Sequence, residues 1–329
     1  MKAILCRQYG SPESLTLEDV PGLVPGPKQV VIAVHAAAVN FPDTLIIEGK
    51  YQFKPEMPFS PGGEVSGVIV RIGHEVSGLQ LGQRVLAPLG WGGYAEEAVA
   101  EAWRVLPIPP TMDFATASAF ALTYGTSHHA LQDRAQIQAG ETLLVLGAAG
   151  GVGLAAIEIG KAMGARVIAA ASSDDKLAVC AAHGADALIH YEREDLRERI
   201  RQITNGCGVD VVYDPVGGAY SEPALRSIAW NGRFLVVGFA AGNIPSIPLN
   251  LPLLKGCAIV GVFWGAFARN EPARNAQNMQ QLFSWFEQGK VKPHICARYP
   301  LEQAADAMTA VANRSAKGKV VITVAQTST

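Results

Sequence analysis

A glycine-rich turn between an apolar strand and an apolar helix constrains this chain more than any other feature of its sequence. The strand is TLLVLG (142–147) and the helical pattern is LAAIEIGKAMG (154–164). The glycines of the turn, in GxxGxxG spacing with one addition, are Gly147, Gly150, Gly151 and Gly153. A helix that begins among glycines directly after a strand presents bare backbone N–H groups to a phosphate. The turn therefore predicts a phosphate site; the alternative is close packing of helix on strand without a ligand.

The turn belongs to a long series of alternating strands and helices. Helical patterns are predicted at 113–132, 154–164, 174–184, 194–206 and 219–230, and strands at 142–147, 166–171, 187–191, 209–216, 233–239 and 258–265. Near-continuous apolar strands that alternate with helices indicate a parallel sheet covered on both faces. After this series we expect helices at 272–289 and 301–314 and a last strand at 319–325.

The first third of the chain has a different architecture. Short β-branched runs at 29–39, 63–73 and 83–89 are separated by Gly-Pro clusters, which is typical of a barrel or sandwich. Twelve of the twenty prolines lie in residues 1–110, none in 111–214 and eight in 215–329, so the chain contains two kinds of domain. The connection 40–62 is long enough to be a functional loop.

Charge and cysteine content narrow the function classes. The chain has 27 basic and 29 acidic side chains, so its net charge gives no reason to expect nucleic acid or an anionic membrane as partner. Five scattered cysteines indicate free thiols in a reducing compartment. The uncharged stretch 234–254 contains three prolines and two asparagines, which argues against a membrane helix. We expect a soluble cytoplasmic protein.

The end of the second strand indicates which dinucleotide the turn binds. An acidic residue there would bind the ribose of NAD, but the segment reads ASSDDK (171–176). Ser172 and Ser173 leave room and donors for a 2′-phosphate, and Lys176 is placed to pair with it. The two aspartates fit the first turn of the next helix. The segment predicts NADPH, with an ordinary solvated lysine as the alternative for Lys176.

Motifs along the whole chain resemble those of the zinc-independent, zeta-crystallin-like quinone oxidoreductases, a family of the medium-chain dehydrogenase/reductase superfamily. The motifs are NFPDTLIIEGKY (40–51), PGGEVSG (61–67), IGHEVSGLQLGQRV (72–85), GGYAEEAV (92–99), LTYGT (122–126), GAAGGVG (147–153), VVYDPVGG (211–218) and GRFLVVGF (232–239). The resemblance implies an α/β fold: a GroES-like β-rich catalytic domain interrupted by a Rossmann doubly wound parallel-sheet domain. It places the first part of the catalytic domain at 1–122, the Rossmann NADP-binding domain at 123–266 and the return to the catalytic domain at 267–329.

The resemblance also implies that the chain binds no metal. Zinc-dependent relatives carry Cys and His ligands at the positions occupied here by Pro42 and Gly63, neither of which can ligate. The adjacent His128 and His129 would point about 100° apart on a helix and make a poor pair of ligands, so a helix surface or interface is expected there. Glu64 matches a family glutamate and is either a structural buried carboxylate or catalytic.

The implied catalytic residues are Tyr51, Asn40 and Asp43. Asn40 is expected near the nicotinamide ribose, and Asp43 is expected to orient its neighbours. Tyr51 is either a proton donor, a wall for a flat acceptor, or an aromatic anchor of its loop. Leu45 occupies the place of a second family tyrosine, which makes the pocket more apolar.

The implied cofactor-binding residues are Asn40, Thr123, Gly150, Gly151, Val152, Gly153, Ser172, Ser173, Lys176, Tyr191, Gly238, Phe239, Phe263, Trp264 and Gly265. Thr123 is expected to face the nicotinamide, or else to bond back to a helix carbonyl. Phe263, Trp264 and Gly265 are expected to end the sixth strand, with core packing as the alternative for the two aromatic side chains.

Together these features predict an NADPH-dependent, zinc-independent reductase that transfers hydride to a quinone or activated enone. The first alternative is an enoyl-thioester (enoyl-CoA type) reductase, which the lack of a basic cluster in 40–62 disfavours. The second is a non-enzymatic, crystallin-like protein that binds NADPH or RNA. We expect a homodimer, because the strand at 258–264 is apolar enough to pair across a two-fold axis.

Overall fold

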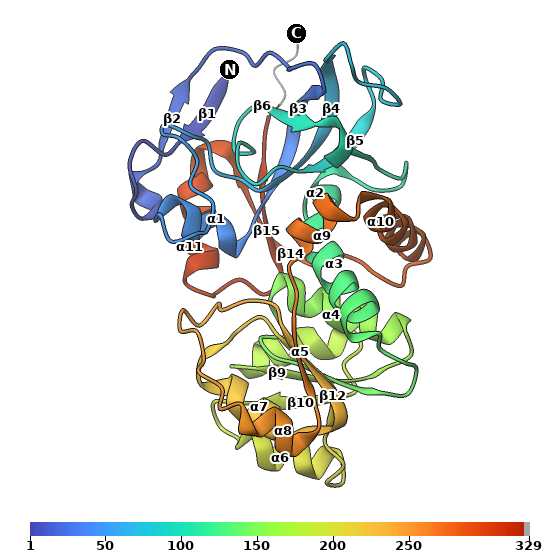
Figure 1. The fold of residues 1–329 in the computed structure, drawn as a ribbon. Helices are drawn as coiled ribbons and strands as arrows, with labels where there is room; N and C mark the ends of the chain where they lie inside the picture. Colours follow the sequence, from blue (N-terminus) through green and yellow to red (C-terminus); the bar gives the residue numbers. More distant parts are fainter. Residues whose placement is uncertain (326–329) are drawn as a thin grey trace. The chain divides into compact units, whose positions relative to one another are not determined.

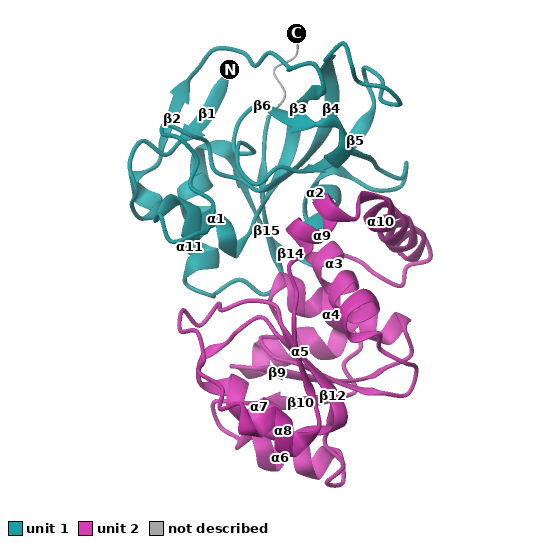
Figure 2. Ribbon diagram, in the orientation of Figure 1, with its two compact units in different colours: residues 1–122, 293–329 teal, residues 123–292 magenta. Residues whose placement is uncertain are grey.

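The computed structural model describes residues 1–325 and divides into two compact units (Figures 1 and 2). Unit 1 combines Met1–Leu122 with Pro293–Thr329, and unit 2 is Thr123–Lys292. The first crossing between the units lies between Leu122 and Thr123. The second falls after residue 292, so residues 267–292, which we expected in the returning catalytic segment, group with unit 2.

Unit 1 is built on β-strands from both ends of the chain. Its elements are β1 (Lys2–Leu5), β2 (Thr16–Asp19), β3 (Gln29–Val39), α1 (Phe41–Ile47), β4 (Glu64–Ile72), β5 (Arg84–Pro88), β6 (Glu97–Glu101), β7 (Leu106–Pro107), α2 (Phe114–Ser118), β14 (Ile295–Pro300), α11 (Ala304–Ala312) and β15 (Lys319–Thr323). A seven-stranded sheet has the order β14-β15-β3-β4-β5-β7, with β6 also paired to β3. The predicted β-rich domain is therefore present.

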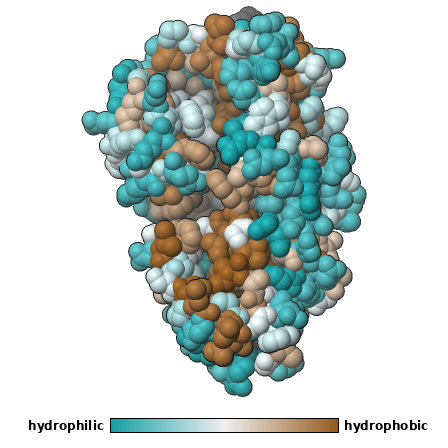
Figure 3. Space-filling model, viewed as in Figure 1, coloured by the Kyte–Doolittle hydropathy of each residue, from teal (hydrophilic) through white to brown (hydrophobic). Residues whose placement is uncertain are grey.

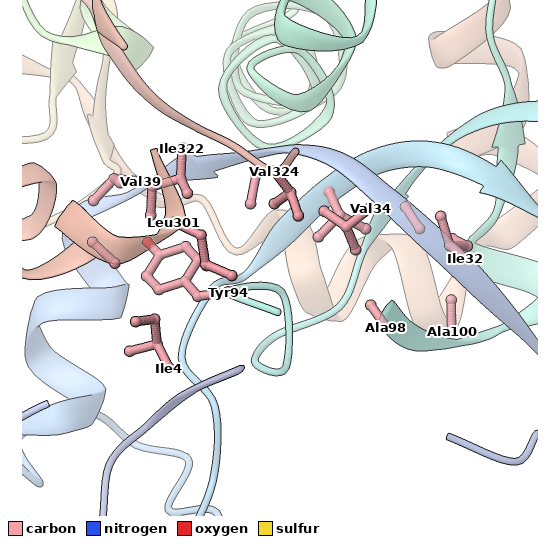
Figure 4. Close-up of a cluster of buried hydrophobic side chains, with 14 of the residues drawn as sticks. Ile4, Ile32, Val34, Val39, Tyr94, Ala98, Ala100, Leu301, Ile322 and Val324 are labelled. Atoms are coloured by element: carbon pink, nitrogen blue, oxygen red, sulfur yellow. The ribbon is translucent and has the colours of Figure 1, made fainter. Parts of the chain in front are cut away.

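The C-terminal strand β15 lies antiparallel against β3, with Val320 opposite Val39. Side chains from both strands enter one apolar core, in which Val34 and Ile322 are fully buried (Figure 4). The pairing also brings the first residue of β15, Lys319, beside Asn40, which directly follows β3. The returning segment thus contributes to the core and places a charged side chain beside Asn40.

Unit 2 contains the alternating strands and helices that the sequence predicted. After α3 (Ala121–His128), which contains the first crossing, and a π-helix at His129–Ala135, the elements are β8 (Thr142–Val145), α4 (Gly151–Ala162), β9 (Arg166–Ala171), α5 (Asp174–Ala182), β10 (Ala187–His190), α6 (Leu196–Ile203), β11 (Val209–Asp214), α7 (Ser221–Arg226), β12 (Ile228–Val236), α8 (Asn250–Lys255), β13 (Ala258–Gly261), α9 (Trp264–Asn270) and α10 (Pro272–Glu287).

The six strands of unit 2 form a parallel sheet in the order β10-β9-β8-β11-β12-β13. The first strand of the unit, β8, lies inside the sheet, and the chain winds outward from it in both directions. This is the strand order of a doubly wound Rossmann fold. The order reverses between β8 and β11, so a crevice for a ligand is expected at the carboxyl ends of these strands.

Helices α9 and α10 explain why residues 267–292 group with unit 2. Trp264 donates its indole N–H to Asn275 across the two helices at 3.0 Å. Arg274 and Asn278 of α10 both bind the carboxylate of Asp133, in the π-helix, at 2.8–2.9 Å. These polar contacts fasten α10 to unit 2, and the periodicity of 272–289 gave no sign of the partner. None of the helices within residues 1–325 is long and apolar enough to cross a membrane.

Candidate active-site and cofactor-binding residues

Asn40 and Asp43 are held by the start of a short helix rather than by a loop. The helix α1 begins after Asn40, and the Asp43 Oδ2 atom accepts a hydrogen bond from the Asn40 backbone N–H at 2.8 Å. The hydroxyl of Tyr94 donates to the same oxygen at 3.0 Å. Because this carboxylate satisfies a backbone donor that a helix N-terminus leaves unpaired, Asp43 fixes the position of Asn40. The expectation that Asp43 orients its neighbours agrees with these contacts.

The side chain of Asn40, at the N-cap of α1, contacts two charged residues of the sheet. Its Nδ2 group donates to Glu64 Oε1 at 3.0 Å, and its Oδ1 atom accepts from the Lys319 ammonium at 2.5 Å. Lys319 also donates to Glu64 Oε1 at 3.0 Å. All three residues are at most 5% exposed. They form one buried, hydrogen-bonded cluster, hereafter the Asn40 cluster.

The second oxygen of Glu64 is used as well, because Oε2 accepts the backbone N–H of Leu122 at 3.0 Å. Both oxygens of this buried carboxylate therefore have partners. Of the two roles that the sequence left open for Glu64, these contacts fit the structural one. Lys319 was not among the predicted site residues. The signal that could have found it is its position, because Lys319 begins an otherwise apolar strand that is buried. A lysine buried there needs a partner of opposite charge.

Burial controls the ionisation of the groups beside the Asn40 cluster. Burial raises the pKa of Asp43 to about 7, although the Asn40 N–H, the Tyr94 hydroxyl and the Lys319 charge act in the opposite direction. Burial and the nearby Asp43 also hold the pKa of Tyr94 well above its usual value. The Tyr94 hydroxyl therefore stays protonated and remains a donor at neutral pH.

Tyr51 lies four residues beyond α1 and is half-buried against the core of unit 1. Its ring meets that of Phe53 edge-on, with the centroids 5.8 Å apart. Burial, with a smaller contribution from Asp43, raises the pKa of its hydroxyl above the ordinary value. The phenol is thus a protonated donor, and the ring contacts also fit the role of an aromatic anchor.

The two positions where zinc-dependent relatives carry ligands have structural roles in this chain. Pro42 stands in the first turn of α1, where a missing N–H has no cost. Gly63 lies so close to α1 that a Cβ atom there would be 3.2 Å from Asp43 Oδ1. Within the described residues, no group of three or more His, Cys, Asp or Glu side chains is placed to hold a metal ion.

The glycines of the turn in unit 2 differ in how closely the rest of the protein packs against them. A Cβ atom on Gly153 would lie 2.6 Å from the carbonyl oxygen of Ala148, so helix packing requires that glycine. Gly150, at the N-cap of α4, would meet only the carbonyl oxygen of Gly147, at 3.4 Å. Gly151 and Val152 form the first turn of α4. The open side at Gly150 fits the close approach of a phosphate to the backbone.

Ser172, Ser173 and Lys176, which the sequence predicts to bind the 2′-phosphate, lie in contact after β9. The Lys176 ammonium donates to Ser172 Oγ at 3.0 Å, and Ser173 caps α5 by accepting the Lys176 N–H at 3.4 Å. Asp174 turns away and pairs with Arg193 at 2.8 Å. The end of this strand therefore presents two hydroxyls and a cation, without the acidic side chain that would bind a ribose 2′-OH.

Other predicted cofactor residues lie at the same edge of the sheet of unit 2. Tyr191 follows β10, and its ring lies 4.3 Å from that of Tyr220. Gly238 follows β12 and donates its N–H to the carbonyl of Asp214, at the end of β11. Phe239 comes next and lies against Gly217, where a Cβ atom would be 2.9 Å from its ring. Thr123, near the start of α3, is 2% exposed.

The prediction that Phe263, Trp264 and Gly265 end the sixth strand is wrong. The strand β13 ends at Gly261, and residues 264–270 form helix α9. The Trp264 ring packs so tightly on α3 that a Cβ atom on Gly125 would lie 2.7 Å from it. Trp264 therefore belongs to the core, whereas Phe263 is 50% exposed at the start of the helix. The apolar run hid the turn because both the strand end and the helix start are apolar.

The prediction of a helix surface or interface at His128 and His129 is also wrong, since the two residues are only 2% and 6% exposed. His129 shares a hydrogen bond with Asp133 at 2.8 Å and stacks on Phe267. His128 lies against Trp285, and burial lowers its pKa to about 4. These contacts hold the π-helix to α9 and α10.

The two units and their sites define a medium-chain dehydrogenase/reductase, in which a GroES-like domain accompanies a Rossmann-type domain. Residues 26–110 match the family of alcohol dehydrogenase GroES-like domains, and residues 151–285 match the family described as zinc-binding dehydrogenase. Within this superfamily, the chain belongs to the quinone oxidoreductase-like family.

The relatives show this membership directly. The chain is 40% identical to the quinone oxidoreductase-like protein 2 homolog of Nematostella vectensis, over 99% of this chain and 89% of the relative. It is 35% identical to the quinone oxidoreductase of Rattus norvegicus, over 98% and 97%. Escherichia coli quinone oxidoreductase complexed with NADPH has a similar structure, with a TM-score of 0.92 at 27% identity over 98% of this chain and 100% of that one.

Proposed function

We propose that this protein is an NADPH-dependent, zinc-independent reductase that transfers hydride to a quinone or an activated enone. The observation that carries the proposal is the group formed by Ser172, Ser173 and Lys176, next in the sheet to an open glycine turn. Such a group recognises the 2′-phosphate that distinguishes NADPH from NADH. The relatives named quinone oxidoreductase and the NADPH complex of the Escherichia coli enzyme support the same cofactor and acceptor class.

The residues of unit 2 would hold the phosphate end of the cofactor. We propose that the N–H groups at the start of α4 donate to the pyrophosphate beside Gly150, and that the Lys176 ammonium and the Ser172 hydroxyl donate to the 2′-phosphate. Tyr191 and its neighbour Tyr220 offer flat surfaces for the adenosine. NADPH, when bound, supplies the hydride for the reaction.

The residues of unit 1 would serve the nicotinamide and the acceptor. We propose that Asn40 binds the nicotinamide ribose, held in place by Asp43. Tyr51 would donate a hydrogen bond to the acceptor carbonyl, because its raised pKa keeps the phenol protonated at neutral pH. The chain carries no ligands at the two zinc positions, Pro42 and Gly63, so an acceptor that takes hydride readily is the suitable substrate.

Replacement of Tyr51 separates its two possible contributions. Loss of a proton donor costs roughly 10²-fold in rate, so Tyr51→Phe should lower kcat by about that factor if the hydroxyl acts in catalysis. Tyr51→Leu should in addition raise KM for the acceptor, because the ring is lost. A Tyr51→Phe variant with unchanged kcat would leave the ring as the only contribution of this residue, with solvent as the proton source.

The function is tested by NADPH consumption with a panel of quinones, enones and crotonyl-CoA. We expect oxidation of NADPH by quinones or enones. Faster turnover of crotonyl-CoA would favour an enoyl-thioester reductase instead. Tight NADPH binding without oxidation by any acceptor, together with salt-sensitive RNA binding that NADPH displaces, would favour the non-enzymatic alternative.

We further propose a homodimer built on the edge strand of unit 2. The strand β13 has one neighbour, β12, and three of its four residues are exposed. Apolar side chains around it are 70–82% exposed; they are Trp230, Leu249, Leu253 and Leu254. Figure 3 shows brown side chains gathered over the region where Figure 1 labels α7 and α8. Exposed apolar patches of this kind mark interfaces, and a light-scattering mass of one chain would refute the dimer.

We also propose that the protein works in a reducing compartment, the cytoplasm. The five cysteines, all within the described residues, are free. Burial raises the pKa of the Cys180 thiol to about 12. Unpaired thiols suit a reducing environment. Cell fractionation tests the location, and recovery of the protein with secreted or membrane fractions would contradict it.

A further inference from the structure

The Lys319 ammonium is buried and contacts both a carboxamide oxygen and a carboxylate. Its Nζ atom lies 2.5 Å from Asn40 Oδ1 and 3.0 Å from Glu64 Oε1, and the residue is 4% exposed. We propose that Lys319 is a positioning residue of the cofactor site, which locks the Asn40 side chain as a hydrogen-bond acceptor toward the ligand. This inference rests on the proposed NADPH site and names the ligand group that Asn40 recognises.

The two ends of the Asn40 carboxamide have different partners. The Nδ2 group donates to Glu64 Oε1 at 3.0 Å and to the carbonyl oxygen of Ala38 at 3.4 Å. An amide nitrogen carries two hydrogens, so both donors are already used. The Oδ1 atom has two lone pairs, of which Lys319 occupies one. Asn40 therefore has an acceptor to offer a ligand and no donor.

Lys319 makes this orientation the only stable one. An ammonium group donates hydrogen bonds and accepts none. If the carboxamide rotated by half a turn, its NH₂ group would face the Lys319 ammonium, and its oxygen would face the Glu64 carboxylate. Both contacts would then be repulsive in a site shielded from solvent. The pair of opposite charges thus selects one of two orientations that are nearly equal in shape.

The chemistry of the ligand follows from this orientation. A group that binds Asn40 must donate a hydrogen bond, which fits the hydroxyl of a ribose and excludes a carbonyl or a phosphate oxygen. The orientation of Asn40 depends on the returning segment of the chain, because the pairing of Val320 with Val39 places Lys319 beside Asn40. A strand from the end of the chain therefore positions Asn40.

The test compares Lys319→Met and Lys319→Arg with the surface control Lys28→Met. Lys28 is also in unit 1, and its side chain is 76% exposed in a 3.7 Å ion pair with Glu75. We expect Lys319→Met to raise Kd and KM for NADPH about tenfold, the worth of one hydrogen bond to the ligand, while KM for the quinone stays unchanged. Lys319→Arg, which keeps the cation, should recover most of the affinity, and Lys28→Met should match the wild type.

A double variant keeps the test decisive if Lys319→Met alone folds poorly. Glu64→Gln combined with Lys319→Met removes both charges, so it should unfold close to the wild type and still bind NADPH weakly, because nothing fixes the Asn40 oxygen. Wild-type affinity in a folded Lys319→Met protein, or in the double variant, would overturn the inference and leave the proposed function intact. A wild-type protein that binds no NADPH would overturn the proposed function first, and the inference with it.

Discussion

Lys319 and Glu64 form an ion pair with a nitrogen–oxygen distance of 3.0 Å, although 255 positions separate them and their side chains are only 5% and 1% exposed. The sheet of unit 1 creates this contact, because β3 lies between β15, which begins with Lys319, and β4, which begins with Glu64. Asn40 follows β3 and lies between the two charges. One strand order therefore accounts for the whole cluster.

The pair predicts a specific pattern of stability. Removal of one partner from a buried ion pair leaves an uncompensated charge and costs about 3–5 kcal/mol. We expect Lys319→Met to lower the free energy of unfolding by that amount and the Glu64→Gln, Lys319→Met double variant to recover most of it. Urea denaturation measures both. Equal unfolding free energies for the wild type and Lys319→Met would show that the pair is not buried as described.

Asp43 predicts a pH dependence of stability. Its pKa is about 7 in the folded chain, whereas the unfolded chain has the usual value near 4, so the folded state holds a proton that the unfolded state releases. Stability contributed by this group is therefore complete below about pH 4 and falls as pH rises to about 7, by up to about 1.4 kcal/mol per pH unit.

The Asp43→Asn variant lacks this titration. In urea denaturation at pH 5, 6 and 7, the advantage of the wild type over Asp43→Asn should shrink as pH rises. Parallel stability curves for the two proteins would contradict the raised pKa of Asp43.

The glycines of the turn in unit 2 should separate stability from binding. Gly153→Ala places a methyl group 2.6 Å from a backbone oxygen and should destabilise the protein by about 1–3 kcal/mol. Gly150→Ala meets no such contact and has φ of −78°, which alanine accepts, so the melting temperature should change little. Isothermal titration should nevertheless show weaker NADPH binding by Gly150→Ala. Unchanged affinity would argue against a phosphate at this position.

Lys176 predicts cofactor preference. A hydrogen bond to a charged group is worth about 1.5–3 kcal/mol, or roughly 10–150-fold in affinity. Lys176→Met should raise Kd for NADPH within that range and leave Kd for NADH unchanged. Lys161→Met, which removes a partly exposed lysine paired with Asp186 on the same unit, is the matched control. A parallel loss for both nucleotides would mean that Lys176 supports the fold rather than the 2′-phosphate.

Much of this architecture was predictable because its signals are local. The predicted strand at 166–171 coincides with β9, since a continuous apolar run between helices has few other solutions. The group at Ser172 and Lys176 was equally accessible, because its members are four residues apart at one helix start. The predicted helix at 113–132 was less accurate, because the structure divides it into α2, α3 and a π-helix.

The remaining features depend on contacts between distant segments, which local patterns do not contain. Lys319 lies beside Asn40 only because β15 pairs with β3. Trp264 looked like the end of a strand because its neighbours on both sides are apolar. It begins helix α9 instead, and its ring packs against Gly125, which is far from it in the sequence. Helix α10 was found by its periodicity, but its place in unit 2 depends on Asp133, more than 100 residues earlier in the chain.

The most direct test of the proposed function is the absorbance of NADPH at its nicotinamide band during incubation with the wild-type protein and a quinone. The proposed function predicts oxidation of NADPH that requires both the protein and the quinone. The reaction should be slower when NADH replaces NADPH, and slower in the Lys176→Met variant. No oxidation with any quinone or enone, from a protein that binds NADPH tightly, would contradict it.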